Sequence, residues 1–128
     1  MKHAFARLFG GDDTYEDILD KSDITETPME DDLAYADEVV KGIQEHIEDI
    51  DRLIEELAIG WSIGRMPKVD LSILRVAIFE MMYREDIPEG VSINEAVELA
   101  KRFGGDGSPA YINGMLGTLS KRLAKGEA

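Results

Sequence analysis

The chain has 128 residues, no cysteine, 44% hydrophobic residues and a net charge of −13. This length predicts one domain with a real core, and the lack of cysteine excludes a disulfide scaffold, a zinc–thiolate site and a cysteine nucleophile. No apolar run is long enough to span a membrane and no secretory signal opens the chain, so we expect a cytoplasmic protein without membrane contact.

The acidic excess lies entirely in the first half of the chain. Residues 1–60 hold 18 Asp/Glu against 5 Lys/Arg, whereas residues 61–128 hold 9 of each. Because phosphate is repelled by such a surface, nonspecific nucleic-acid binding by the whole chain is not expected. Most of these charges are interpreted as a solvated face, although the same face could attract a basic protein.

The first half reads as helices joined by loops. Residues 1–9 are amphipathic, 12–19 favour a second helical piece and 21–28 favour a loop. The clearest pattern then predicts one long helix that ends near Gly60, because its apolar residues recur in steps of three and four. They are Leu33, Ala36, Val40, Ile43, Ile47, Ile50, Ile54 and Leu57.

The second half begins with a connector in which Trp61 is expected to anchor in the core. Asp70 is predicted to be the N-cap of a helix over residues 71–84. That helix is apolar on most sides, which places it at the centre of a bundle. Pro88 and Gly90 then favour a turn.

Two further helices complete the second half. Ser92 and Glu95 match a capping box, which predicts a helix start at Ser92, and Gly104–Gly105 predicts its end. Ser108–Pro109 reads as an N-cap followed by proline, which predicts the last helix. Positive charge suits the end of that helix, and it is present at Lys121, Arg122 and Lys125.

Few groups suggest catalysis. His46 and Asp49 are one helical turn apart and could share a metal ion, although a solvent-facing histidine beside carboxylates is the simpler interpretation. The acidic run at 12–17 lacks the spacing of a calcium loop, FGGDG lacks the phosphate-loop pattern, and no G-x-S-x-G elbow is present. We therefore expect neither an enzyme nor a cofactor.

The segment 69–117 contains four motifs in order. They are an acidic residue opening I-L-R-x-A-x-x-E, then D-I-P, then I-N-E-A-V-E-L-A-K-x-F-G, then an aromatic followed by I-N-G. This order resembles the C-terminal half of the NusB family of bacterial transcription antitermination factors. The resemblance implies an all-α, noncatalytic NusB-like domain over residues 1–128, made of two small helical subdomains. Residues 1–60 would supply the acidic N-terminal helices and residues 61–128 the C-terminal bundle.

The resemblance also implies partners. NusB pairs with NusE, a small-subunit ribosomal protein, and the two hold boxA RNA in nascent ribosomal transcripts. The complex then joins RNA polymerase and resists termination. Some family members form homodimers that mask the RNA surface, so a homodimer is a further expectation.

Individual residues can be matched to family positions. Phe9 and Asp70 match positions that contact NusE, although Asp70 could instead serve as an N-cap. Tyr111 matches an aromatic close to RNA, where it could stack on an unpaired base or simply pack in the core. Lys101 and Arg102 could contact phosphate or remain solvated.

The N-terminal region departs from the family pattern, which usually has an arginine-rich stretch near R-R-x-x-A-R-E. Here only Lys2, His3 and Arg7 stand in that region, and we assign Lys2 and Arg7 to RNA contact. Their small number predicts either a truncated start or weaker RNA affinity.

Two alternative functions remain open. One is a module that binds NusE with little RNA binding, and the other is a targeting domain of an RNA cytosine methyltransferase. The second is disfavoured because the chain has no cofactor-binding domain.

Overall fold

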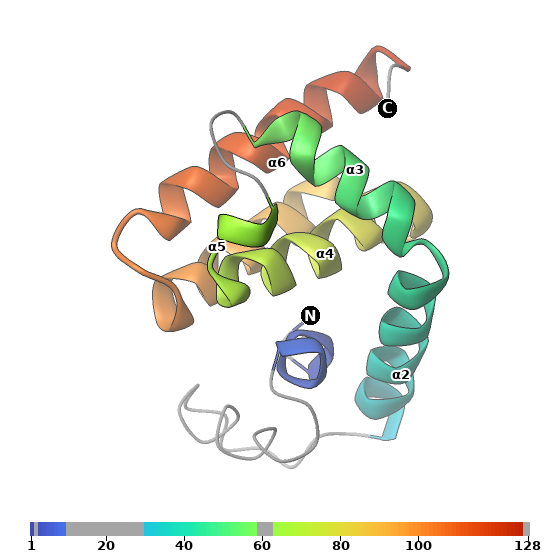
Figure 1. Ribbon diagram of the computed structural model, residues 1–128. Coiled ribbons are helices and arrows are strands. Elements are labelled where there is room, and N and C mark those ends of the chain that lie inside the picture. The colour runs from blue at the N-terminus through green and yellow to red at the C-terminus, as the bar shows by residue number, and fades with distance from the viewer. Residues whose placement is uncertain (2, 10–29, 59–62, 127–128) are drawn as a thin grey trace.

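The computed structural model describes residues 1, 3–9, 30–58 and 63–126 (Figure 1). Every regular element in these ranges is helical, which confirms the all-α prediction. The predictions for residues 10–29, Gly60 and Trp61 lie outside the described residues. The elements are a helix over residues 3–9, α2 (Glu30–Glu45), α3 (Ile47–Leu57), the 3-10 turn η1 (Ile63–Arg65), α4 (Lys68–Tyr83), α5 (Glu89–Phe103) and α6 (Ser108–Ala124).

Helix α4 is the centre of the molecule, as its apolar sequence predicts. It contacts α2, α3, α5 and α6, and Figure 1 shows it running between them. A helix that is buried on most sides must be apolar on most sides, because polar groups on a buried face would lose their hydrogen bonds to water. Its fully buried apolar residues are Ile73, Leu74, Val76, Ala77 and Ile78.

The prediction of one long helix over residues 33–57 is wrong. The helix breaks at His46, whose φ of −114° and ψ of 18° are not helical, and α3 leaves in a new direction (Figure 1). The His46 ring stacks on Tyr83 of α4, with ring centroids 4.2 Å apart. Both halves keep an apolar face toward α4, so the sequence period continues through the bend and cannot reveal it.

The apolar seam of α2 also differs from the prediction by one residue. Val39 is fully buried, whereas Val40 is only partly buried. Between Ala36 and Ile43 the helical period allows the buried residue to be either Val39 or Val40, because steps of three then four and of four then three fit equally well. The sequence pattern therefore does not choose between them.

Two predicted helix starts are wrong in the same way. Helix α4 begins after Pro67 and α5 after Pro88, and each of these prolines has ψ of 138°. Asp70 and Ser92 therefore lie inside the first turn of their helices and are not N-caps. Gly90 likewise lies within α5 and does not break it. Proline suits the position just before a helix, since its ring fixes φ and it has no N–H to leave unpaired.

The turn between α5 and α6 follows the prediction closely. Gly104 is the C-cap of α5, and α6 starts at Ser108, with Gly107 as N-cap in place of Ser108. The Gly105 N–H donates to Ser108 Oγ at 3.0 Å, which closes the turn. A Cβ atom at Gly104 would lie 2.7 Å from the Ser108 Cβ, so the close approach of the two helix ends requires glycine.

Ser92 has a different role from the one predicted, because it bonds to a buried carboxylate. Glu80 of α4 is 3% exposed and accepts hydrogen bonds from Ser92 Oγ and from the Tyr35 hydroxyl, each at 2.8 Å. A buried carboxylate is tolerated only when it is hydrogen-bonded. This network therefore ties α2, α4 and α5 together through polar groups.

The Tyr35 hydroxyl gives a testable pH dependence. Burial, together with the hydrogen bond to Glu80 and its negative charge, raises the pKa of Tyr35. The unfolded chain loses this proton at a pH of about 10 while the folded chain keeps it, so the free energy of unfolding falls as pH rises further. We expect Tyr35→Phe to be less stable than the parent chain at neutral pH but to lose stability less steeply between about pH 10 and 11.5. Urea unfolding at several pH values measures both, and equal slopes would contradict this assignment.

No described helix is both long enough and apolar enough to cross a membrane.

Candidate functional site

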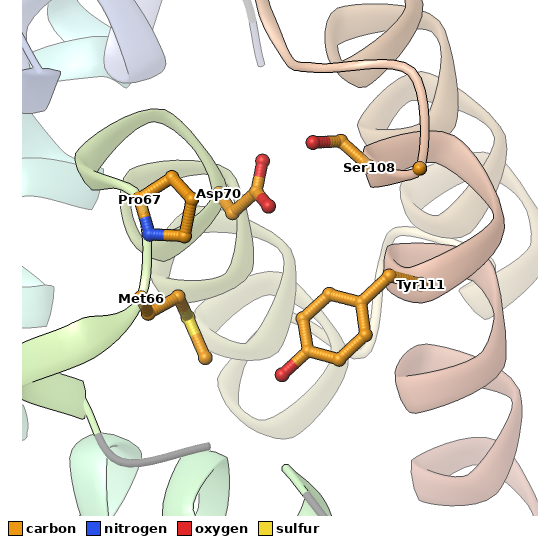
Figure 2. Close-up of a pocket in the computed structure, with 6 residues that line it drawn as sticks. Met66, Pro67, Asp70, Ser108 and Tyr111 are labelled. Carbon is orange, nitrogen blue, oxygen red and sulfur yellow. The ribbon is translucent and has the colours of Figure 1, made fainter. Parts of the chain in front are cut away.

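Asp70 and Tyr111 are brought to the same pocket, between the start of α4 and the start of α6. The pocket has a volume of about 260 Å³. Figure 2 shows the Asp70 carboxylate and the Ser108 hydroxyl directed toward each other, with the Tyr111 ring extending toward Met66. The lining residues are Met66, Pro67, Asp70, Gly107, Ser108 and Tyr111.

Asp70 gives this pocket its chemical character. The residue is 4% exposed, and no described residue donates a hydrogen bond to its Oδ1 atom. A buried carboxylate oxygen without a donor is costly, because it has lost its water and gained nothing in return. The pocket therefore suits a group that brings donors, above all a cationic side chain.

The ring of Tyr111 lines the pocket, and the charge of the Asp70 carboxylate acts on its phenol group. Burial raises the pKa of Tyr111, and the negative charge of Asp70 raises it further. The phenol therefore remains neutral at physiological pH. Tyr111 is partly buried and packs against the core, which agrees with the packing role predicted for it.

Phe9 lies next to the start of α4. Its ring stacks on Phe5 at a centroid distance of 5.6 Å, and the Lys68 Nζ atom lies 5.5 Å from its centre. Lys68 is two residues before Asp70 in α4. Phe9 and Asp70 are the two residues assigned to partner contact. Phe9 contacts Lys68, which lies in the same helical turn as Asp70.

The four basic residues assigned to RNA contact do not gather at one place in the described structure. Lys101 and Arg102 are exposed in the last turn of α5, where Lys101 pairs with Glu98 at 3.2 Å. Arg7 is directed toward α2, where its guanidinium pairs with Asp37. Lys2 lies outside the described residues.

The histidine at the bend does not build a metal site. In the described ranges no three His, Cys, Asp or Glu side chains are grouped so that they could hold a metal ion. The interpretation of His46 as solvent-facing needs correction, because the ring is half-buried and stacked on Tyr83.

Sequence reasoning missed the pocket and the cations beside it. The sequence predicts Ser108 only as a helix cap and assigns no role at this place to Met66, Arg65 or Lys68. A signal was present in Pro67, which marks the true start of α4 and so places Asp70 within the first turn of the helix. Its burial depends on α6 lying across α4, which no local pattern shows.

The NusB family model matches residues 4–121, nearly the whole chain. The chain belongs to the NusB family. The transcription antitermination protein NusB of Clostridium novyi is 42% identical over 122 residues, covering 94% of this chain and 92% of that protein. The NusB protein of Geotalea daltonii is 54% identical over 91 residues, which is 71% of this chain and 63% of that protein. These relatives are antitermination proteins, and NusB is not a family of enzymes.

Two solved structures share the fold. NusB of T. maritima is 36% identical to this chain, with a TM-score of 0.73, and the match covers 94% of this chain and 84% of that one. A second structure contains the antitermination factors NusB and NusE in complex with double-stranded RNA. It aligns with a TM-score of 0.72 at 24% identity over 94% of this chain and 92% of that one, which shows that the NusB fold is shared.

Proposed function

We propose that this chain is a noncatalytic transcription antitermination factor that binds boxA RNA of ribosomal transcripts together with NusE. The observation that supports it most is membership of the NusB family over residues 4–121. The assembled factor joins the antitermination complex on RNA polymerase, in the cytoplasm where bacterial transcripts are made. A homodimer that masks the RNA surface is the resting form that the family resemblance allows.

The partner site in this proposal is the Asp70 pocket together with Phe9. NusE is a ribosomal protein with a basic surface, and the pocket holds a buried carboxylate oxygen that no described residue satisfies. A lysine or arginine of NusE would satisfy it, and Tyr111 would pack against the apolar part of that side chain. Phe9 extends the contact along the N-terminal helix.

The RNA-contacting residues in this proposal are Tyr111, Lys101, Arg102, Lys2 and Arg7. With a net charge of −13, the chain alone has little electrostatic attraction for phosphate. The basic partner therefore supplies much of the positive field, and the chain contributes a shaped surface. This division of roles predicts that RNA affinity depends strongly on the presence of NusE.

A second function, NusE binding without RNA binding, is favoured by two observations. The chain carries 27 acidic residues against 14 basic ones, and two candidate RNA contacts, Arg7 and Lys101, already pair with carboxylates of the same chain. Each such pair lowers the positive charge available to phosphate.

One titration separates the two functions. The chain is mixed with boxA RNA or a base-shuffled RNA, with and without NusE, at several salt concentrations. The proposed function predicts tight binding only with NusE and a preference for boxA over the shuffled RNA. NusE binding without that preference would support the second function, and absence of NusE binding would reject both.

A further inference from the structure

Arg65 and Lys68 make no ion pair with any described residue. Several other cations of the described residues are paired, as Arg75 is with Asp51 at 2.8 Å and Arg122 with Glu56 at 3.2 Å. In a chain with almost twice as many acidic as basic residues, a carboxylate partner for each exposed cation would be expected on composition alone.

The position of these two cations is also electrostatically unfavourable. Arg65 ends the η1 turn and Lys68 is the first residue of α4, and both are exposed. The N-terminus of a helix carries partial positive charge, so cations are disfavoured there and anions are attracted. Among the described residues, two cations without an ion-pair partner thus lie between the N-terminal helix and the Asp70 pocket.

Aromatic contacts connect this place with the basic end of α5. Phe103 lies 5.4 Å from Phe5, Phe5 stacks on Phe9, and Lys68 lies over Phe9 at 5.5 Å. Phe103 directly follows Lys101 and Arg102 in the sequence. The rings of Phe103, Phe5 and Phe9 therefore form a row. Lys68 lies at one end of this row, and the other end is the residue that follows Lys101 and Arg102.

We propose that Arg65 and Lys68 bind the phosphate backbone of the RNA and extend the RNA surface from the end of α5 to the start of α4. This inference rests on the proposed function. Phosphate is favoured over an acidic protein surface because the partner assigned to the neighbouring pocket is basic. Two exposed cations would repel that basic partner unless an anion lay between the cations and the partner. RNA phosphate supplies this anion.

The test compares two double variants with equal loss of charge. Arg65→Gln/Lys68→Gln removes the proposed contacts, and Lys121→Gln/Lys125→Gln removes two exposed cations near the end of α6, which likewise have no ion pair with a described residue. Affinity of each NusE-bound chain for boxA RNA is measured across salt concentrations, and affinity for NusE alone is measured in parallel. Circular dichroism and thermal unfolding confirm that each variant is folded.

Each phosphate contact to single-stranded RNA contributes about 0.7 to the slope of log affinity against log salt. We expect Arg65→Gln/Lys68→Gln to reduce that slope by about 1.4 and to weaken binding about 25-fold at about 0.1 M salt. The Lys121→Gln/Lys125→Gln variant should match the parent chain.

Three results would overturn the inference. Unchanged slope and affinity in a folded Arg65→Gln/Lys68→Gln variant would remove these residues from the RNA surface. Weaker NusE binding with an unchanged salt slope would assign them to a protein contact. Absence of any RNA binding by the parent complex would overturn the proposed function and this inference with it.

Discussion

Asp70→Asn is expected to weaken NusE binding by about 2 kcal/mol or more, at least about thirtyfold, while leaving the free chain as stable as before or more stable. The carboxylate is 4% exposed and its Oδ1 atom accepts no hydrogen bond from a described residue, so it costs free energy in the free chain. An amide of nearly the same shape removes the buried charge and with it the attraction for a cationic side chain.

Asp106→Asn is the matched control for this prediction. Asp106 is exposed in the turn just before α6, close in sequence to the pocket residue Ser108. Because exposed single charges contribute little, we expect no more than a slight change in NusE affinity. Calorimetric titration and urea unfolding of both variants give the two quantities. A loss of stability above about 2 kcal/mol in Asp70→Asn would show that Asp70 is structural, and unchanged NusE affinity would remove it from the interface.

Gly42→Ala is expected to destabilise the fold by about 1–3 kcal/mol, although alanine normally favours a helix. A Cβ atom at Gly42 would lie 2.4 Å from Cε2 and Cζ of Phe79. The Phe79 ring cannot move away freely, since it is 6% exposed and packs on Tyr83 at 5.5 Å. The added methyl group must therefore displace α2 from α4.

Gly117→Ala is expected to change the free energy of unfolding in the opposite direction. Gly117 lies inside α6, and a Cβ atom there would meet no atom within 4 Å. The gain in helix propensity should raise the free energy of unfolding by about 0.5–1 kcal/mol. Urea unfolding of both variants measures the difference. Equal effects of the two substitutions would show that α2 does not pack on α4 as closely as the structure describes.

How far the sequence predicts the fold is clearest around α4. Its apolar run predicts a central helix, and the motifs of residues 69–117 indicate the family. The bend at His46 is not predictable in the same way, because its stacking partner Tyr83 is on another helix and both halves of the seam face the same core. Local patterns describe each helix, whereas the break depends on contact between helices.

The candidate site shows the same limit. The family motifs single out Asp70 and Tyr111, and the structure brings both to one pocket. The burial of Asp70 could not be predicted, since it follows from α6 crossing the start of α4. The place of Lys68 over Phe9 is also a tertiary feature, because the N-terminal helix reaches the start of α4 from a distant part of the sequence.

Hydrogen–deuterium exchange on the chain, before and after addition of NusE and boxA RNA, tests the proposed interaction face most directly. The expected result is slower exchange in the N-terminal helix (3–9), in η1 and the first turn of α4, and around the start of α6, with α3 unchanged. Protection confined to the acidic helix α3, with the start of α4 and of α6 exchanging as in the free chain, would contradict it.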